Sequence, residues 1–133
     1  MFALIDLATA VDLRTTVTQL LPPQGRSLLE ESVYADTVPV GPWLVDLRLS
    51  PDVNALWLNR RPESNWGYAF DSDLRFDQLR RHFRKFSLVA LDGRKDPVFF
   101  RYFDPVVLSG FLSDWGEPEQ TANFLEPLRN LQR

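Results

Sequence analysis

Apolar residues along the chain form short, continuous runs that are typical of buried strands. The clearest are Phe2–Leu7, Pro42–Arg48 and Trp66–Phe70, each only a few residues long and bounded by polar or turn-forming residues. A weaker candidate is the stretch Arg26–Ser32. The pattern therefore predicts four strands within the first 70 residues.

Other apolar residues recur at helical spacing. Such a pattern runs from Leu13 to Leu21 and stops at Pro22-Pro23. A second helix is expected to begin with Ser50 as its N-cap and Pro51 in its first turn, where the missing N–H costs nothing. Its predicted inner face contains Val53, Leu56 and Trp57.

The longest predicted helix covers Leu74–Phe86 and follows Asp71–Asp73, which offer caps for its first turn. A shorter helix is expected over residues 106–112, and a last helical segment over Glu119–Leu131, bent at Pro127. The apolar stripe of the longest helix comprises Phe76, Leu79, Phe83 and Phe86.

Residues 87–103 predict a β-hairpin, with strands Ser87–Leu91 and Val98–Phe103 and a turn at Asp92-Gly93. Strand alternation places Arg101 among phenylalanines, and a guanidinium removed from water needs a partner. Asp104 is the nearest candidate, and Asp6 is another. The favoured interpretation is that Arg101 and Asp104 tie the strand end to the following helix.

Helices interleave with strands throughout the 133 residues, a length suited to one domain. This order predicts an α/β (α+β) fold, a single layered domain over residues 1–133 with a sheet flanked by helices and no separate C-terminal extension. The sheet is expected to be mixed, because at least one hairpin is antiparallel.

Composition and motifs argue against an enzyme. The chain has no cysteine, one histidine, His82, and no Asp/Glu cluster with metal-ligand spacing. Its six glycines are isolated, so phosphate-binding loops and the GxSxG motif are missing. We therefore expect no catalytic residue, no metal and no cofactor, and a structural role for His82. The lack of cysteine and of a long apolar run favours a cytoplasmic protein.

Charge is distributed unevenly along the chain. The window from Arg75 to Arg101 contains eight Lys or Arg and three Asp, so it is +5 while the remainder is −8. A helix face that combines Arg80, Arg81 and Arg84 is a candidate partner-binding patch, although such faces are commonly only solvated. Trp115, in the polar stretch "SDWGEPE", is the tryptophan expected to be most exposed, and it is a second candidate.

Several stretches resemble the adaptor (effector-chaperone) domain of bacterial type VI secretion. The more specific ones are "LRRHFRKF" (79–86) and "FFRYFDPVVLSGFL" (99–112), in which an L-x-x-H-[LF]-R pattern precedes R-[FY]-x-D-P-x-V-L. Weaker ones are "LIDLA" (4–8), "RSLLE" (26–30), "PWLVDL" (42–47), "WG" (66–67) and "DGR" (92–94). These stretches occur in the same order as in the family and together extend over nearly the whole chain.

The resemblance implies a cytoplasmic, non-enzymatic protein that holds a toxic effector and loads it onto the VgrG spike, with no nucleic-acid or membrane partner. Phe103 stands where the family usually has tyrosine. The alternative is a small nucleic-acid-binding protein that uses the basic helix 74–86, but a pI of about 5.1 disfavours it. The motif positions correspond to Trp66, Gly67, His82, Arg84, Arg101, Tyr102, Asp104 and Pro105.

Overall fold

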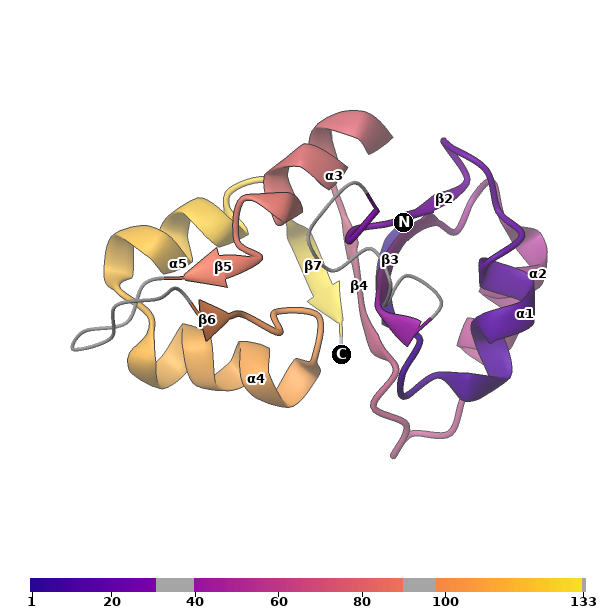
Figure 1. Ribbon diagram of the computed structural model, residues 1–133, viewed down its shortest axis with the longest axis horizontal. Coiled ribbons are helices and arrows are strands. Elements are labelled where there is room, and N and C mark those ends of the chain that lie inside the picture. Colours follow the sequence, from indigo (N-terminus) through magenta and orange to yellow (C-terminus); the bar gives the residue numbers. More distant parts are fainter. Residues whose placement is uncertain (31–39, 90–97, 133) are drawn as a thin grey trace.

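The computed structural model describes residues 1–30, 40–89 and 98–132, and the centre of this part is a five-stranded sheet in the order β2-β3-β1-β4-β7 (Figure 1). Two further strands, β5 and β6, form a separate pair. The strands are β1 (Phe2–Asp6), β2 (Gly25–Ser27), β3 (Pro42–Asp46), β4 (Gly67–Asp71), β5 (Leu88–Val89), β6 (Val98–Phe99) and β7 (Arg129–Gln132).

Every neighbouring pair in the five-stranded sheet is antiparallel. The predicted α+β class is confirmed, but the prediction of a mixed sheet is wrong. Strands β3 and β4 are connected through a helix and run in the same direction, as a crossover would require. Because β1 lies between them, they never pair directly, and all hydrogen-bonded neighbours are antiparallel.

Helices cover both faces of the sheet (Figure 1). One face is covered by α1 and α2, and the other by α3, α4 and α5, with the π-helical turn η3 following α4. The helices are η1 (Val11–Leu13), α1 (Arg14–Val17), α2 (Pro51–Leu58), α3 (Phe76–Arg84), α4 (Pro105–Gly110), η3 (Phe111–Trp115) and α5 (Pro118–Leu125).

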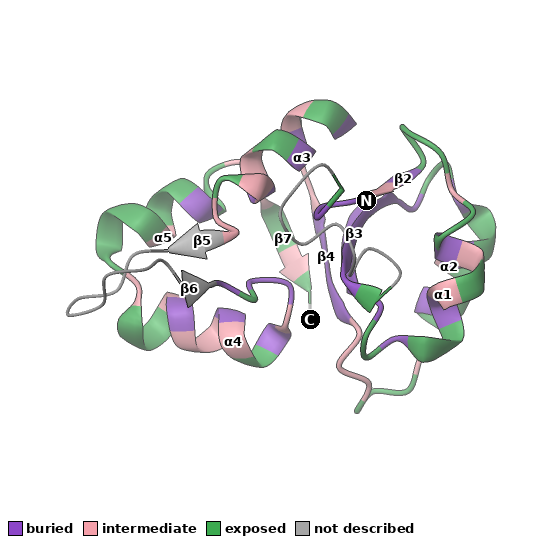
Figure 2. Ribbon diagram, in the orientation of Figure 1, coloured by how far each residue is buried: buried purple, intermediate pink, exposed green. Residues whose placement is uncertain are grey.

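The sheet is shared by two hydrophobic cores. Along β1, Leu4 packs into the core under α3–α5, whereas Ile5 packs into the core under α1 and α2, because successive strand side chains point to opposite faces. Strand β4 alternates in the same way, with Phe70 on the first side and Ala69 on the second. The burial of both faces explains why these strands are continuous apolar runs (Figure 2).

Helix boundaries differ from the predictions in two places. Helix α3 begins at Phe76, and its N-cap is Arg75, whose backbone N–H donates to Oε1 of Gln78 at 3.0 Å, so Asp71–Asp73 do not cap it. In α2, Val53 and Trp57 are buried as predicted, but Leu56 is 39% exposed.

The C-terminal part also departs from the predictions. The last helix ends at Leu125, and Arg129–Gln132 form a strand paired with β4 instead of continuing the helix. The pairing of β5 with β6 confirms the hairpin, although β6 stops at Phe99. The predicted turn at Asp92-Gly93 lies outside the described residues.

Among the residues that the structure describes, no helix has both the length and the apolar character needed to cross a membrane.

Candidate functional site

Three motif segments that are distant in sequence meet where β1 ends and β4 begins. The backbone N–H of Asp6 donates to the carbonyl of Trp66 at 2.7 Å, and a guanidinium N–H of Arg101 donates to Oδ2 of Asp6 at 3.2 Å. The partner of Arg101 is therefore Asp6, the second of the two candidates. The favoured Arg101–Asp104 tie is wrong, because Arg101 lies beyond β6 and its side chain reaches back to β1.

The two members of this ion pair lie in different environments. Asp6 is 1% exposed, and its carboxylate also accepts from the Thr9 hydroxyl and the Ala8 N–H, so its charge is well solvated by the protein. The Arg101 side chain is 49% exposed, and its guanidinium carbon lies 5.6 Å from the centre of the Phe103 ring. Phe103 is itself buried, in the position where the family usually has tyrosine.

Asp104 caps the helix that follows. Its Oδ1 accepts from the N–H of Val106 at 2.8 Å and from the side-chain amide of Asn65 at 3.2 Å. Pro105 occupies the first turn of α4, where no N–H is needed. The Asp104-Pro105 pair thus starts α4 and connects it to the loop before β4.

Gly67 allows strands β1 and β4 to approach closely. Its φ of +145° is unfavourable for L side chains, and a Cβ there would lie 1.8 Å from the carbonyl oxygen of Leu4. One residue further on, the hydroxyl of Tyr68 donates to the carbonyl of Tyr102 at 2.9 Å. Burial raises the pKa of both tyrosines, so they stay neutral inside the larger core.

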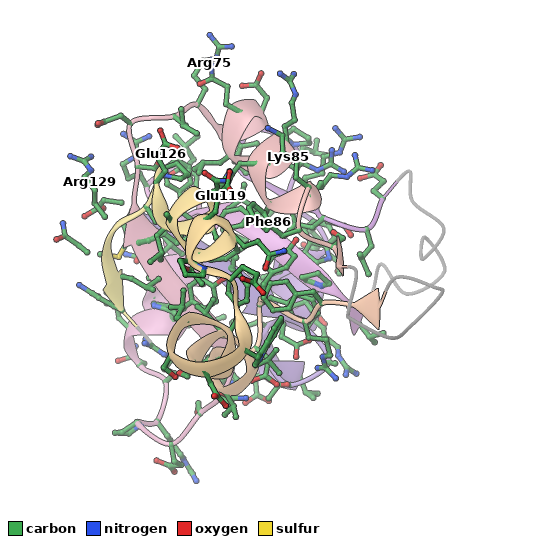
Figure 3. All side chains as sticks on the ribbon, turned by 90° about the vertical axis from the view of Figure 1, so that its left-hand side faces the viewer. Arg75, Lys85, Phe86, Glu119, Glu126 and Arg129 are labelled. Carbon is green, nitrogen blue, oxygen red and sulfur yellow. The ribbon has the colours of Figure 1, made fainter. Side chains whose placement is uncertain are left out.

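His82 is placed as a structural residue. Its Nε2 lies 2.9 Å from the carbonyl oxygen of Phe124 on α5, which fixes Nε2 as the protonated, donating nitrogen. Burial lowers the pKa of His82 below its ordinary 6.5, and the bond to Phe124 partly opposes this shift. Figure 3 shows Lys85 and Phe86, which directly follow α3, beside α5 with Glu119 and beside Glu126, the residue after α5. His82 therefore connects α3 to α5.

Arg80 does not belong to an exposed basic face. It is only 8% exposed, and its guanidinium donates to the carbonyl oxygens of Ser27 at 3.0 Å and Glu30 at 3.3 Å. The residue lies on the side of α3 that faces β2, so it connects the helix to the edge of the sheet. The prediction that Arg80 is a solvent-exposed partner-binding residue is therefore wrong.

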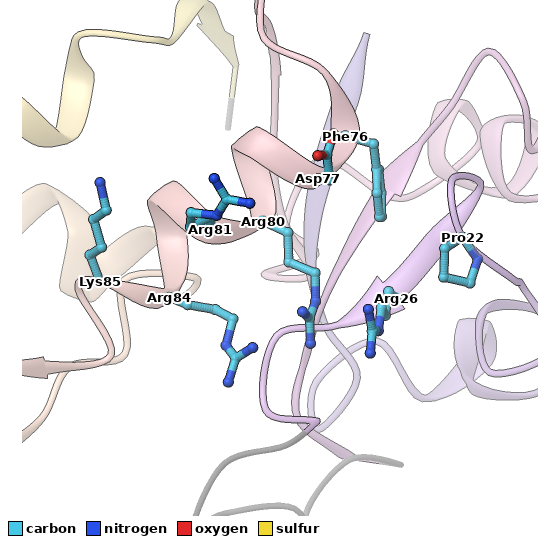
Figure 4. Close-up of a pocket in the computed structure, with 8 residues that line it drawn as sticks. All are labelled: Pro22, Arg26, Phe76, Asp77, Arg80, Arg81, Arg84 and Lys85. Carbon is cyan, nitrogen blue, oxygen red and sulfur yellow. The ribbon is translucent and has the colours of Figure 1, made fainter.

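The other cations of α3 surround a depression between this helix and β2 (Figure 4). Its volume is about 550 Å³. In Figure 4 the guanidinium groups of Arg26, Arg80 and Arg84 lie on one side of α3, while Arg81 and Lys85 project toward the other side. The lining residues are Pro22, Arg26, Phe76, Asp77, Arg80, Arg81, Arg84 and Lys85. Pro22 and Arg26 come from a segment that no sequence pattern connects with α3.

Trp115 is 43% exposed, as the sequence predicts for it. It ends η3, and its ring packs against Phe100 at 5.2 Å and Phe111 at 5.0 Å between centroids, over Gly110. These contacts hold the ring in one position at the surface. The depression beside α3 has no lining residue from α4 or η3, so the two predicted partner-binding regions do not form one pocket.

Within residues 1–30, 40–89 and 98–132, no group of three His, Asp or Glu side chains is arranged to hold a metal ion. The buried carboxylate of Asp46 pairs with Arg48 at 3.1 Å. Asn65 is the contact residue that sequence reasoning missed. Its partner Asp104 lies 39 positions away, and no local signal links them.

Comparison with protein families gives one match. A family model described as "Domain of unknown function (DUF4123)" matches residues 1–122 of the chain. Searches of curated proteins and of solved structures found no match.

Proposed function

Because the chain belongs to the DUF4123 family of unknown function, we propose that its role is the one implied by the sequence motifs, an adaptor of bacterial type VI secretion. In this role it binds a toxic effector in the bacterial cytoplasm and helps to load it onto the VgrG spike. It acts through protein–protein contacts, without catalysis or a cofactor.

The observation that carries the proposal is the convergence of the motif residues. Asp6, Trp66, Arg101 and Asp104 come from three separate motif stretches and meet through the hydrogen bonds at the β1–β4 end. Residues of the motifs that resemble the adaptor domain thus contact one another at one end of the sheet, and they fall inside the matched range 1–122.

Two surfaces of the described residues are candidates for partner binding. One is the basic depression of α3, and the other is the neighbourhood of Trp115, whose ring is both exposed and fixed. Arginine and tryptophan are the residue types most enriched at the energetic centres of protein interfaces. Their presence at these surfaces supports binding of a protein partner.

Affinity purification of the tagged chain from its native bacterium, followed by mass spectrometry, tests the proposal. We expect a VgrG protein and one large toxin-like protein to co-purify. The Arg81→Glu/Lys85→Glu variant should lose a partner while Arg61→Glu, an exposed charge reversal in the α2–β4 loop, retains it. Recovery of neither protein from the unmodified chain would contradict the adaptor role.

The gathering of cations beside α3 also favours a second candidate, nucleic-acid binding. Salt dependence separates the two functions. Affinity for nucleic acid falls steeply as the logarithm of the salt concentration rises, whereas an interface with an apolar centre responds much less.

A further inference from the structure

We propose that an extended acidic segment of the partner protein docks in a groove along the outer side of β2. An apolar side chain of that segment binds at one end, and its carboxylates bind at the other. This inference rests on the proposed function, since it takes the partner to be the effector. We call this feature the β2 groove.

The β2 groove consists of two adjoining depressions. One is the basic depression of about 550 Å³ beside α3, and the other, of about 730 Å³, lies over the connection between α1 and β2. Pro22 and Arg26 line both, so the two depressions lie next to each other. The combined groove is longer than a single side chain requires, which suits an extended segment.

The end near α1 is apolar. Leu20 and Leu21 line it together with Pro22 and the edge of Trp43. Leu21 is 71% exposed, whereas Trp43 is 6% exposed and is held in the core below. An apolar side chain that binds here would cover Leu21 and remove apolar surface from water.

The end near α3 is positive. Arg81 and Lys85 are exposed, lie one helical turn apart and are among the residues that line this end. Five Arg or Lys line this end against one carboxylate, Asp77, which already accepts from Arg75 at 3.3 Å. The local excess of positive charge attracts carboxylates and selects against basic segments.

Two backbone groups at this edge of the sheet already have partners, which disfavours the addition of a partner strand. The carbonyl of Ser27 already accepts from Arg80, and the N–H of Gly25 donates to the carbonyl of Leu21 at 3.4 Å. These backbone groups of β2 are therefore engaged, and recognition in the β2 groove depends on side chains. This distinguishes the site from strand addition, in which main-chain hydrogen bonds supply the affinity.

The groove suits a peptide better than a nucleic acid. Stacking of bases requires exposed aromatic faces, and the two aromatic residues that line the groove, Trp43 and Phe76, are 6% and 8% exposed. A segment with separate apolar and acidic parts matches both ends.

Fluorescence anisotropy with the full chain and labelled synthetic peptides tests the inference. The probe carries leucines at one end and consecutive glutamates at the other. One control peptide replaces the glutamates with glutamine, a second replaces the leucines with serine, and a single-stranded oligonucleotide of equal charge is the third. We expect the probe to bind about tenfold more tightly than each control, a difference of about 1.4 kcal/mol.

Variants locate the binding site. Arg81→Glu/Lys85→Glu and, separately, Leu21→Asp should each weaken probe binding about tenfold, whereas Arg61→Glu should leave it unchanged. Circular dichroism confirms that each variant is folded. Equal binding of probe and control peptides, no binding, tighter binding of the oligonucleotide, or no effect of the groove variants would each overturn the inference.

The two proposals fail in different ways. The peptide assay contains no secretion component, so a negative result there, together with co-purification of VgrG and a toxin, would remove only the β2 groove. Specific probe binding without co-purification of either protein would retain the groove and remove the adaptor role.

Discussion

A positive charge inside the protein determines how α3 meets the edge of the sheet. Arg80 is nearly inaccessible to water, and its guanidinium donates to backbone carbonyls that lie 53 and 50 positions earlier in the chain. Burying a guanidinium is unfavourable unless its donors are satisfied. The contact therefore fixes the position of α3 relative to β2.

Replacing Arg80 should destabilise the protein more than replacing its neighbour. Arg80→Met keeps much of the apolar stem but leaves the carbonyls of Ser27 and Glu30 without these donors, so we expect a loss of about 2–4 kcal/mol in the free energy of unfolding. The exposed control Arg81→Met should change it by no more than about 0.5 kcal/mol. Urea denaturation measures both, and equal effects would refute the structural role of Arg80.

Replacing Gly67 with alanine should destabilise the protein even more strongly. In Gly67→Ala, the new Cβ would overlap the carbonyl oxygen of Leu4 at a residue whose φ is +145°, so β1 and β4 could not keep their spacing. We expect a loss of about 4 kcal/mol or more, seen as insoluble expression or a large fall in thermal midpoint. Gly110→Ala is the control, because Gly110 has helical φ and its Cβ would approach only the half-exposed Trp115 side chain, at 3.3 Å from Nε1, and not backbone. A stable Gly67→Ala protein would contradict this geometry.

Elements are coupled by a few side chains, and His82 couples α3 to α5. Because its pKa in the folded protein lies below 6.5, the unfolded chain binds more protons as the pH falls through this range. The stabilisation is thus fully present above pH 6.5 and declines as the pH drops toward the folded pKa.

The expected result is a fall in urea midpoint as the pH is lowered from 7 to about 5.5, above the range in which carboxylates titrate. His82→Gln should flatten this slope, since glutamine does not titrate and retains an N–H for the Phe124 carbonyl. The chain has no other histidine, so the assignment is direct. An unchanged slope in the variant would exclude His82 as its source.

Sequence patterns predicted the strands that are buried on both faces of the sheet. They failed for the strand whose formation depends on pairing with a neighbouring strand. The apolar runs of β1, β3 and β4 reflect burial that each strand experiences along its own length. In contrast, Leu125, Leu128 and Leu131 have a spacing compatible with a helix, yet the last of them lies in β7. That strand is mostly exposed and forms by pairing with β4, a contact that no local pattern encodes.

The candidate site shows the same limit. Asp104 before Pro105 is a local helix-start signal, and Asp104 caps α4 in the structure, but the sequence interpretation assigned it to Arg101 instead. The partner of Arg101 lies 95 positions earlier, so sequence proximity favoured the wrong carboxylate. For Arg80, the charge suggested solvent exposure. The backbone carbonyls that accept its hydrogen bonds have no signature in the sequence, so its burial could not be predicted.

The whole molecule is organised around one sheet with a core on each face. Trp43 and Trp57 are buried in the core under α1 and α2, and Trp66 packs against it. Trp115 alone contacts the opposite core, through Phe100 and Phe111. Tryptophan fluorescence therefore reports mainly on the core under α1 and α2. Most helical residues, in α3, α4 and α5, lie on the opposite face of the sheet.

This asymmetry allows a test of whether the two cores unfold together. Because β1 and β4 contribute side chains to both cores, neither core can lose its packing without exposing strands on which the other depends. In Trp115→Phe, tryptophan fluorescence follows the α1–α2 side and far-ultraviolet circular dichroism follows mainly α3–α5. We expect the two urea transitions to coincide, as for a two-state domain. Separate midpoints would mean that each helical layer unfolds from the sheet on its own.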